Sequence, residues 1–130
     1  MRYKKPDKKN ALSILEAAQR DMKYILSLEI TGESGATIVR NVYECFRMLG
    51  DSLLVAQGMN SEDHIAPINE LMKLKVKTER PIHLVENLRR LRHNINYYGY
   101  KPTINEVNDV RAISLSLFKP MICEILKLIS

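Results

Sequence analysis

Apolar residues recur at spacings of three and four along almost the whole chain, which is the period of helices that bury one face. They predict five helices, over residues 7–28, 36–57, 61–72, 81–99 and 103–130. No stretch shows the sustained alternation of apolar and polar residues that is typical of strands. We therefore expect an all-α fold, an up-and-down bundle of four to five helices that forms a single domain over residues 1–130.

The ends of these helices carry capping residues. Asp7 and Ser61 have side chains that accept backbone N–H groups in a first turn, and Gly58 and Gly99 suit the conformation that ends a helix. Pro67 lies about two turns into the third helix, so that helix is expected to be bent or to start late.

The last helix begins with a capping signal and contains a proline. Thr103 and Glu106 have the spacing of a capping box, in which each side chain binds the backbone N–H of the other residue. Pro120 lies within the apolar pattern and predicts a kink, because proline lacks an N–H and crowds the preceding turn.

The fourth helix carries an arginine on its apolar face. That face is formed by Leu84, Leu88, Leu91 and Ile95, with Val85 at one edge and Tyr98 at the other. The solvent face carries Arg89, Arg90, His93 and Tyr97. Arg92 falls between Val85 and Leu88, where such a helix normally has an aliphatic residue. Because a guanidinium keeps its proton, an arginine there needs an acceptor or a wet cleft, which makes Arg92 the best functional clue in the chain.

The second helix has a charged side opposite its apolar stripe. Arg40–Glu44 and Arg47–Asp51 are spaced four residues apart and would each stabilise a solvated helix by about 0.2–0.5 kcal/mol. The alternative is a polar cleft or subunit interface in which Glu44 or Asp51 receives Arg92 from another helix.

Composition limits the class of protein. The chain has 130 residues, of which 45% are hydrophobic, and a net charge of +5, which permits contact with a polyanion without establishing it. No apolar run is long enough to cross a bilayer, and the basic N-terminal stretch lacks the apolar segment of a secretory signal. We expect a soluble, cytoplasmic protein that makes no membrane contact.

The sequence contains no pattern of a metal site, a cofactor site or a common enzyme. Cys45 and Cys123 each lie in a helical apolar pattern and are expected to be buried free thiols. His64, His83 and His93 match no zinc-binding spacing, the glycines form no phosphate-binding loop, and no serine lies in a GxSxG motif. We therefore expect no metal and no cofactor.

Arginines, amides and tyrosines gather at the end of the fourth helix, as Arg89, Arg90, Arg92, Asn94, Asn96, Tyr97, Tyr98 and Tyr100. Arginine can bind a phosphate through two hydrogen bonds, and tyrosine rings can stack on bases. This chemistry suits a nucleic acid or a nucleotide. The alternative is that the arginines form a solvated face and the tyrosines close the core.

A resemblance to a known family lies in two segments, IVRNVYECFRMLGDSLLVAQGMNSEDHIAPINEL and ENLRRLRHNINYYGY. Over roughly residues 38–100 the chain resembles the HEPN domain superfamily, in particular its small prokaryotic members. The resemblance implies a helical bundle, usually a homodimer. It also implies either a metal-independent RNase or the partner of a minimal nucleotidyltransferase, as in toxin–antitoxin systems.

The HEPN RNase motif is an arginine, often followed by a polar residue, with a histidine four to six positions after the arginine. Arg92 matches the arginine, His93 matches the polar residue, and Tyr98 stands in place of the histidine. Histidine exchanges protons near neutral pH, whereas an ordinary tyrosine, with a pKa near 10, does not. Tyr100 stands where some members of the family carry a tyrosine to which the partner attaches AMP.

The resemblance and the residues together predict a HEPN-like homodimer, formed through the second and fourth helices, that acts as an RNA- or nucleotide-binding module or as a nucleotidyltransferase partner. Arg92 would lie in a polar pocket whose ligand-binding residues are Glu44, Asp51, Asn96, Tyr97 and Tyr100. One alternative is a metal-independent endoribonuclease that uses Arg92 with Tyr98 or His93. A second alternative is a purely structural interaction bundle in which Arg92 forms only an interface ion pair.

Overall fold

The computed structural model of the chain describes residues 2–3, 5–60, 63 and 65–129. It is all-α, as expected. The helices are α1 (Lys8–Ser27), α2 (Gly35–Ala56), α3 (Ile65–Leu71), α4 (Val85–Tyr98) and α5 (Ile104–Ile129), and a short 3-10 helix, η1 (Ile82–Leu84), leads into α4. Two short strands of two residues each, β1 (Arg2–Tyr3) and β2 (Met59–Asn60), form an antiparallel pair. The sequence pattern did not predict this pair.

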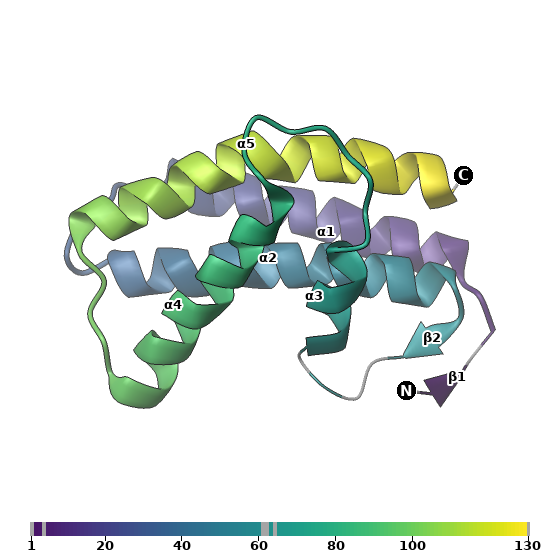
Figure 1. The fold of residues 1–130 in the computed structure, drawn as a ribbon, viewed down its shortest axis with the longest axis horizontal. Helices are drawn as coiled ribbons and strands as arrows, with labels where there is room; N and C mark the ends of the chain where they lie inside the picture. The colour runs from purple at the N-terminus through teal and green to yellow at the C-terminus, as the bar shows by residue number, and fades with distance from the viewer. Residues whose placement is uncertain (1, 4, 61–62, 64, 130) are drawn as a thin grey trace.

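The three longest helices, α1, α2 and α5, run side by side along the length of the molecule, and α4 crosses them obliquely (Figure 1). The central helix is α2, which packs against α1, α3, α4 and α5. The apolar stripe that the sequence predicts is buried except for the half-buried Ala56; its members are Ile38, Val42, Cys45, Leu49, Leu53 and Ala56. Val39, Tyr43 and Leu54, which lie outside that stripe, are buried as well. Because α2 has neighbours on several sides, one stripe was too narrow a prediction for it.

Glycine allows α3 to pack directly on α2. A Cβ atom at Gly50 would overlap the backbone carbonyl of Pro67, so the two helix backbones meet at a position where no side chain fits. Pro67 is buried within α3, which begins only at Ile65, in agreement with the late start that this proline predicted.

The predicted capping residues Asp7, Gly58 and Gly99 are confirmed, whereas the fourth α-helix begins at Val85, after η1, and not at residue 81. The Asp7 side chain accepts a hydrogen bond from the N–H of Asn10 at 2.9 Å, and Gly58 and Gly99 have φ angles of 78° and 65°. Ser61, the expected cap of the third helix, lies outside the described residues. The Asp63 side chain caps that helix by accepting hydrogen bonds from two N–H groups of its first turn.

The capping box of α5 is also present. The N–H of Glu106 donates to Thr103 Oγ1 at 3.1 Å, and the N–H of Thr103 donates to Glu106 Oε1 at 2.8 Å. The helix continues without a break through Pro120.

The burial prediction for Cys123 was wrong. Cys45 is buried, as expected, but Cys123 is exposed on α5, because its position falls just outside the buried stripe that contains Met121, Ile122 and Ile125. In the described part of the chain, no helix has the length and apolar character needed to cross a membrane.

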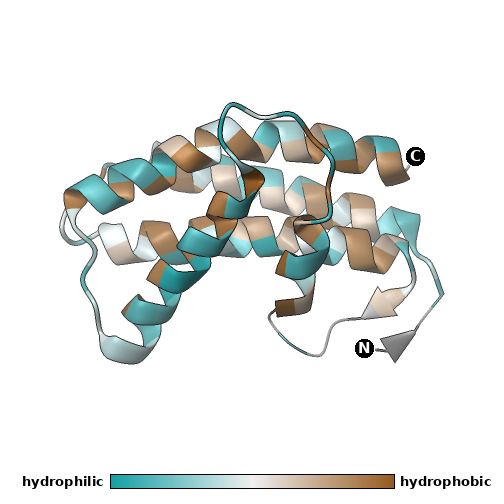
Figure 2. Cartoon of the chain, viewed as in Figure 1, coloured by the Kyte–Doolittle hydropathy of each residue, from teal (hydrophilic) through white to brown (hydrophobic). Residues whose placement is uncertain are grey.

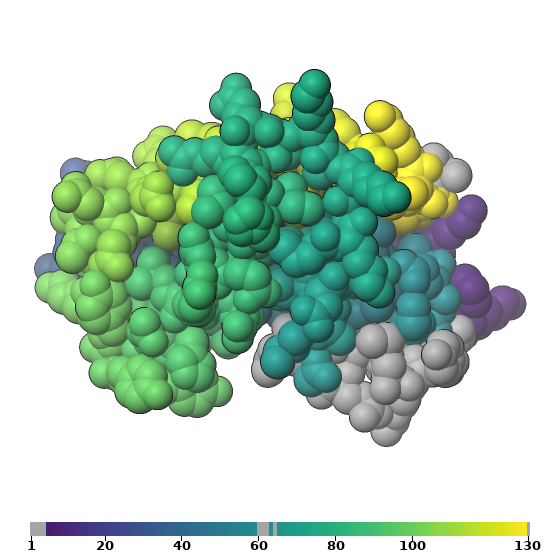
Figure 3. All heavy atoms as spheres, viewed as in Figure 1, coloured from purple at the N-terminus to yellow at the C-terminus, as the bar shows by residue number. Residues whose placement is uncertain are grey.

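The C-terminal end of α4 projects from the bundle, as the ribbon and space-filling views show (Figures 1 and 3). The visible side of α4 is mainly hydrophilic (Figure 2). Its buried residues are Val85, Leu88 and Ile95. Leu91 is partly buried and also packs against the core, whereas the last turn and the solvent face of α4 carry polar and aromatic side chains.

Candidate functional site

Arg92 lies between α4 and α2, on the ring of a buried tyrosine. Its guanidinium carbon is 5.2 Å from the centre of the Tyr43 ring, and the Arg92 side chain is half-buried. Tyr43 is only 1% exposed. The negative face of an aromatic ring attracts a cation. The Tyr43 ring therefore takes the place of the hydrogen-bond acceptor that the sequence led us to expect for Arg92.

A second contact joins the same two helices one turn away. Arg40 Nε donates to Asn96 Oδ1 at 2.7 Å. Arg92 and Asn96 are four residues apart on α4, and Arg40 and Tyr43 are three apart on α2, so each pair lies on one side of its helix. We call these four residues the α2–α4 seam.

The phenol of Tyr43 stays protonated at neutral pH. Burial raises the pKa of Tyr43, and the nearby guanidinium groups of Arg92 and Arg89 only partly oppose that effect. Tyr43 is therefore a neutral ring under the Arg92 cation and not a proton acceptor near pH 7.

The carboxylates expected to receive Arg92 bind another arginine. Arg47 Nε lies 2.9 Å from Glu44 Oε2, and Arg47 Nη1 lies 2.7 Å from Asp51 Oδ2. The predicted pair Arg47–Asp51 is thus confirmed, whereas Arg40 binds Asn96 and not Glu44. The alternative in which Glu44 or Asp51 receives Arg92 is not formed within one chain, because the two carboxylates lie on either side of Arg47 on the same helix.

Three arginines of α2 and α4 have neutral partners. Arg40 binds Asn96, Arg90 binds the side chain of Asn87, and Arg92 lies on Tyr43. In contrast, Arg89 pairs with Glu86 at 2.9 Å. Across the described residues, no carboxylate lies within ion-pair distance of Arg40, Arg90 or Arg92. Their positive charges are therefore held in place without being neutralised.

Three aromatic rings form a cluster at the end of α4. The centres of the His93 and Tyr97 rings are 4.5 Å apart, and those of His93 and Tyr98 are 5.8 Å apart. Tyr97 and Tyr98 are 71% and 76% exposed. The prediction that Tyr98 lies at the edge of the apolar face was wrong, because the last turn of α4 extends beyond the core.

Tyr100 is tied to the start of α5. Its hydroxyl donates to Glu106 Oε1 at 2.6 Å, and this hydrogen bond raises the pKa of Tyr100. The hydrogen bond from the Thr103 N–H and the one from Tyr100 together lower the pKa of Glu106. The structure therefore separates Tyr100 from the seam and from the three-ring cluster, with which the sequence had grouped it.

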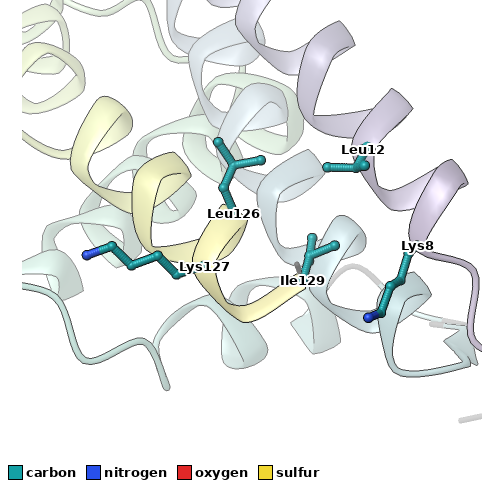
Figure 4. A pocket seen from close by; sticks show the side chains of 5 residues that line it. All are labelled: Lys8, Leu12, Leu126, Lys127 and Ile129. Carbon is teal, nitrogen blue, oxygen red and sulfur yellow. The ribbon is translucent and has the colours of Figure 1, made fainter.

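No three histidine, cysteine or carboxylate side chains come together among the described residues, and His64 lies outside them. A groove of about 390 Å³ between α1 and α5 is lined by Leu12, Leu126 and Ile129, with Lys8 and Lys127 at its rim (Figure 4). Its walls are aliphatic and carry no group that exchanges protons near neutral pH.

Sequence reasoning missed Tyr43 and Arg40 as members of the site. Both lie outside the apolar stripe of α2, and only the crossing of α4 over α2 brings them to Arg92 and Asn96. The one available signal was an aromatic residue three positions after an arginine on a long helix, which is too common to indicate a site. The chain matches no known protein family, no curated protein and no solved structure.

Proposed function

We propose that this chain is a HEPN-like helical protein whose α2–α4 seam binds the phosphate groups of RNA. The observation that carries the proposal is the position of Arg92, which is half-buried on the Tyr43 ring and has no carboxylate partner among the described residues. A guanidinium in that setting is oriented for a ligand while its charge stays available.

The chemistry of the seam suits a phosphate. Arginine binds a phosphate through two parallel hydrogen bonds, and such charge-assisted bonds are about twice as strong as neutral ones. Arg40 uses Nε for Asn96, which leaves its two terminal nitrogens for a ligand. Arg40 and Arg92 together would hold a phosphate group across the two helices.

We propose binding without cleavage as the primary function. Metal-independent RNA cleavage requires a group that accepts a proton near neutral pH beside the bound phosphate. Tyr43 has a raised pKa, and His93 lies on the exposed side of α4 against Tyr97. The endoribonuclease that uses Arg92 with Tyr98 or His93 remains the alternative, and the experiment below distinguishes it.

A titration of fluorescently labelled single-stranded RNA, followed by anisotropy in EDTA, tests the proposal. Arg92→Gln and Arg40→Gln should each weaken binding about tenfold, because each removes a charge-assisted contact. Arg20→Gln is the matched control, since it removes the same charge from an exposed position on α1. The control should change affinity by no more than about twofold.

Each other outcome has a defined meaning. If the control weakens binding as much as Arg92→Gln does, binding reflects net charge alone and the seam is not the site. If RNA is cleaved in EDTA and Arg92→Ala abolishes cleavage, the endoribonuclease replaces our proposal. If RNA is not bound at all, the proposal fails in favour of a protein-binding module, such as a nucleotidyltransferase partner, or of a structural interaction bundle.

We further propose that the chain forms a homodimer through α2 and α4, so that two seams border one cleft. The proposal is supported by the polar and partly exposed outer side of this helix pair, where Glu44, Arg47 and Asp51 lie. Light scattering at high micromolar concentration should give twice the mass of one chain, and a monomer at that concentration would contradict the dimer.

A further inference from the structure

The end of α4 presents a continuous aromatic surface that the core does not need. Tyr97 and Tyr98 expose most of their area, and His93 touches both rings. A large aromatic ring normally buries its faces, so two exposed tyrosines held against one histidine form an unusual surface. Because His93 already contacts both tyrosine rings, less side-chain freedom remains to be lost when a ligand stacks on them.

We propose that His93, Tyr97 and Tyr98 form a stacking platform for the unpaired bases of single-stranded RNA. This inference rests on the proposed function, since the phosphates would lie on the seam while the bases turn toward the rings. The platform would explain why the aromatic residues lie beside the arginines and not in the core. It also restricts the ligand to RNA whose bases are free to stack.

The charge around the platform supports a polyanionic ligand. Residues 87–105 contain Arg89, Arg90, Arg92 and Lys101 and no aspartate or glutamate. The nearest carboxylates in sequence are already bonded, Glu86 to Arg89 and Glu106 to Tyr100 and Thr103. A phosphodiester chain over the last three turns of α4 would therefore meet cations and ring faces, while the carboxylates near α4 lie at its first turn, as Glu86, and on the side that faces α5, as Glu106 and Asp109.

The ring geometry favours RNA over an acidic peptide. A peptide of aspartates and glutamates would use the arginines but would gain nothing from exposed ring faces. A base has a flat π-face that stacks on tyrosine, and each such stack strengthens binding substantially whatever the base. Paired bases in a duplex are hidden from side chains, so the platform selects single strands.

The absence of tryptophan from the chain makes the platform directly observable. Tyr97→Trp introduces one tryptophan into the platform, and Tyr24→Trp places one on α1, where Tyr24 is 66% exposed. A short oligouridine should quench the emission of Tyr97→Trp and leave that of Tyr24→Trp unchanged. Inorganic polyphosphate, which has charge but no bases, should bind without quenching, and an RNA duplex of the same length should quench far less than the single strand.

Affinities separate the platform from the phosphate site. Tyr97→Leu should weaken oligouridine binding about tenfold, whereas Tyr97→Phe, which keeps the ring face, should stay within about twofold of the original chain. The dependence of affinity on salt should be unchanged in Tyr97→Leu and reduced in Arg92→Gln, because only the arginine contacts phosphate.

The platform is overturned if oligouridine binds but Tyr97→Trp is not quenched, or if Tyr97→Leu binds as tightly as the original chain. Either result leaves the phosphate site at the seam intact. Equal binding of duplex and single strand also overturns the platform. If the original chain does not bind RNA at all, the proposed function is wrong, and the platform is wrong with it. Tighter binding of an acidic peptide than of RNA would assign the same surface to a protein partner.

Discussion

The guanidinium carbon of Arg92 lies 5.2 Å from the centre of the Tyr43 ring, so the cation that interrupts the apolar face of α4 is held by an aromatic ring of α2. In the function that we propose, this one pair has both a stability role and a binding role. The ring stabilises the position of the cation, and the absence of a carboxylate among the described residues leaves its charge for a ligand.

The first prediction concerns the energy of this pair. In a double-mutant cycle of Arg92→Met and Tyr43→Leu, the two side chains should show a coupling of about 0.5–2 kcal/mol in the free energy of unfolding. Urea unfolding of the four proteins gives the value. Tyr43→Phe keeps the ring and should retain most of the coupling in a matched cycle, whereas additive effects in both cycles would show that the contact contributes nothing.

The second prediction concerns the contact between α2 and α3. Gly50→Ala should destabilise the chain by about 2 kcal/mol or more, because the new methyl group overlaps the backbone carbonyl of Pro67 and neither helix can move freely. Thermal and urea unfolding measure this effect. Gly32→Ala is the control, since a Cβ there meets only the flexible end of Lys101 at ordinary contact distance. Equal stability of the two variants would contradict the close approach of α3 to α2.

The third prediction concerns pH. The hydrogen bonds from Thr103 and Tyr100 lower the folded-state pKa of Glu106 below the ordinary value of about 4.3. Because the carboxyl of Glu106 has a lower pKa in the folded chain than in the unfolded chain, its ionised form stabilises the fold at any pH above the unfolded-state pKa. That stabilisation is lost as the pH falls through the folded-state pKa. The stability difference between the original chain and Glu106→Gln should therefore be largest near pH 7 and shrink below about pH 4. A difference that stays constant across urea unfolding curves from neutral to acid pH would contradict the assignment.

The fourth prediction concerns the two thiols. Cys123 is exposed and should react rapidly with a disulfide reagent in the folded protein. Burial is the main cause that raises the pKa of Cys45 to about 12, so Cys45 should react only after unfolding. The absorbance of the thiol released from the reagent should thus show one rapidly reacting cysteine in buffer and a second cysteine that reacts only in denaturant. Rapid reaction of Cys45 in the Cys123→Ser variant without denaturant would contradict the prediction, because it would show that the core around Cys45 opens.

Most of the fold could be predicted from the sequence, because periodicity and capping act locally. The apolar repeats of α1 and α2, the glycine at 99 and the Thr103–Glu106 capping box each report on residues no more than one turn away. The two-residue strand pair was not predicted, because so short a pairing leaves no alternating pattern. The exposure of Cys123 was missed because its position falls just outside the buried stripe of α5, and that of Tyr98 because the last turn of α4 extends beyond the core.

The sequence predicted the α4 side of the candidate site but not its α2 side. The sequence identified Arg92 as a misfit, since an arginine on an apolar face conflicts with the local pattern. Its partner could not be predicted, because the choice between Glu44, Asp51 and Tyr43 depends on the angle at which α4 crosses α2. Arg47 binds both carboxylates within its own helix, which leaves the Tyr43 ring for Arg92.

The most direct measurement of the central claim is an NMR titration of the arginine Nε–Hε groups with a short oligouridine. Arg92 and Arg40 should shift as the ligand is added, because their positive charges have no carboxylate partner among the described residues. The Nε–Hε signals of Arg47 and Arg89 should not shift, because these guanidinium groups are already paired with carboxylates, Arg47 with Glu44 and Asp51 and Arg89 with Glu86. The signal that is missing from the spectrum of the Arg92→Lys variant identifies the Nε–Hε group of Arg92. Shifts at Arg47 or Arg89 without a shift at Arg92 would contradict the claim that the cation on Tyr43 binds phosphate.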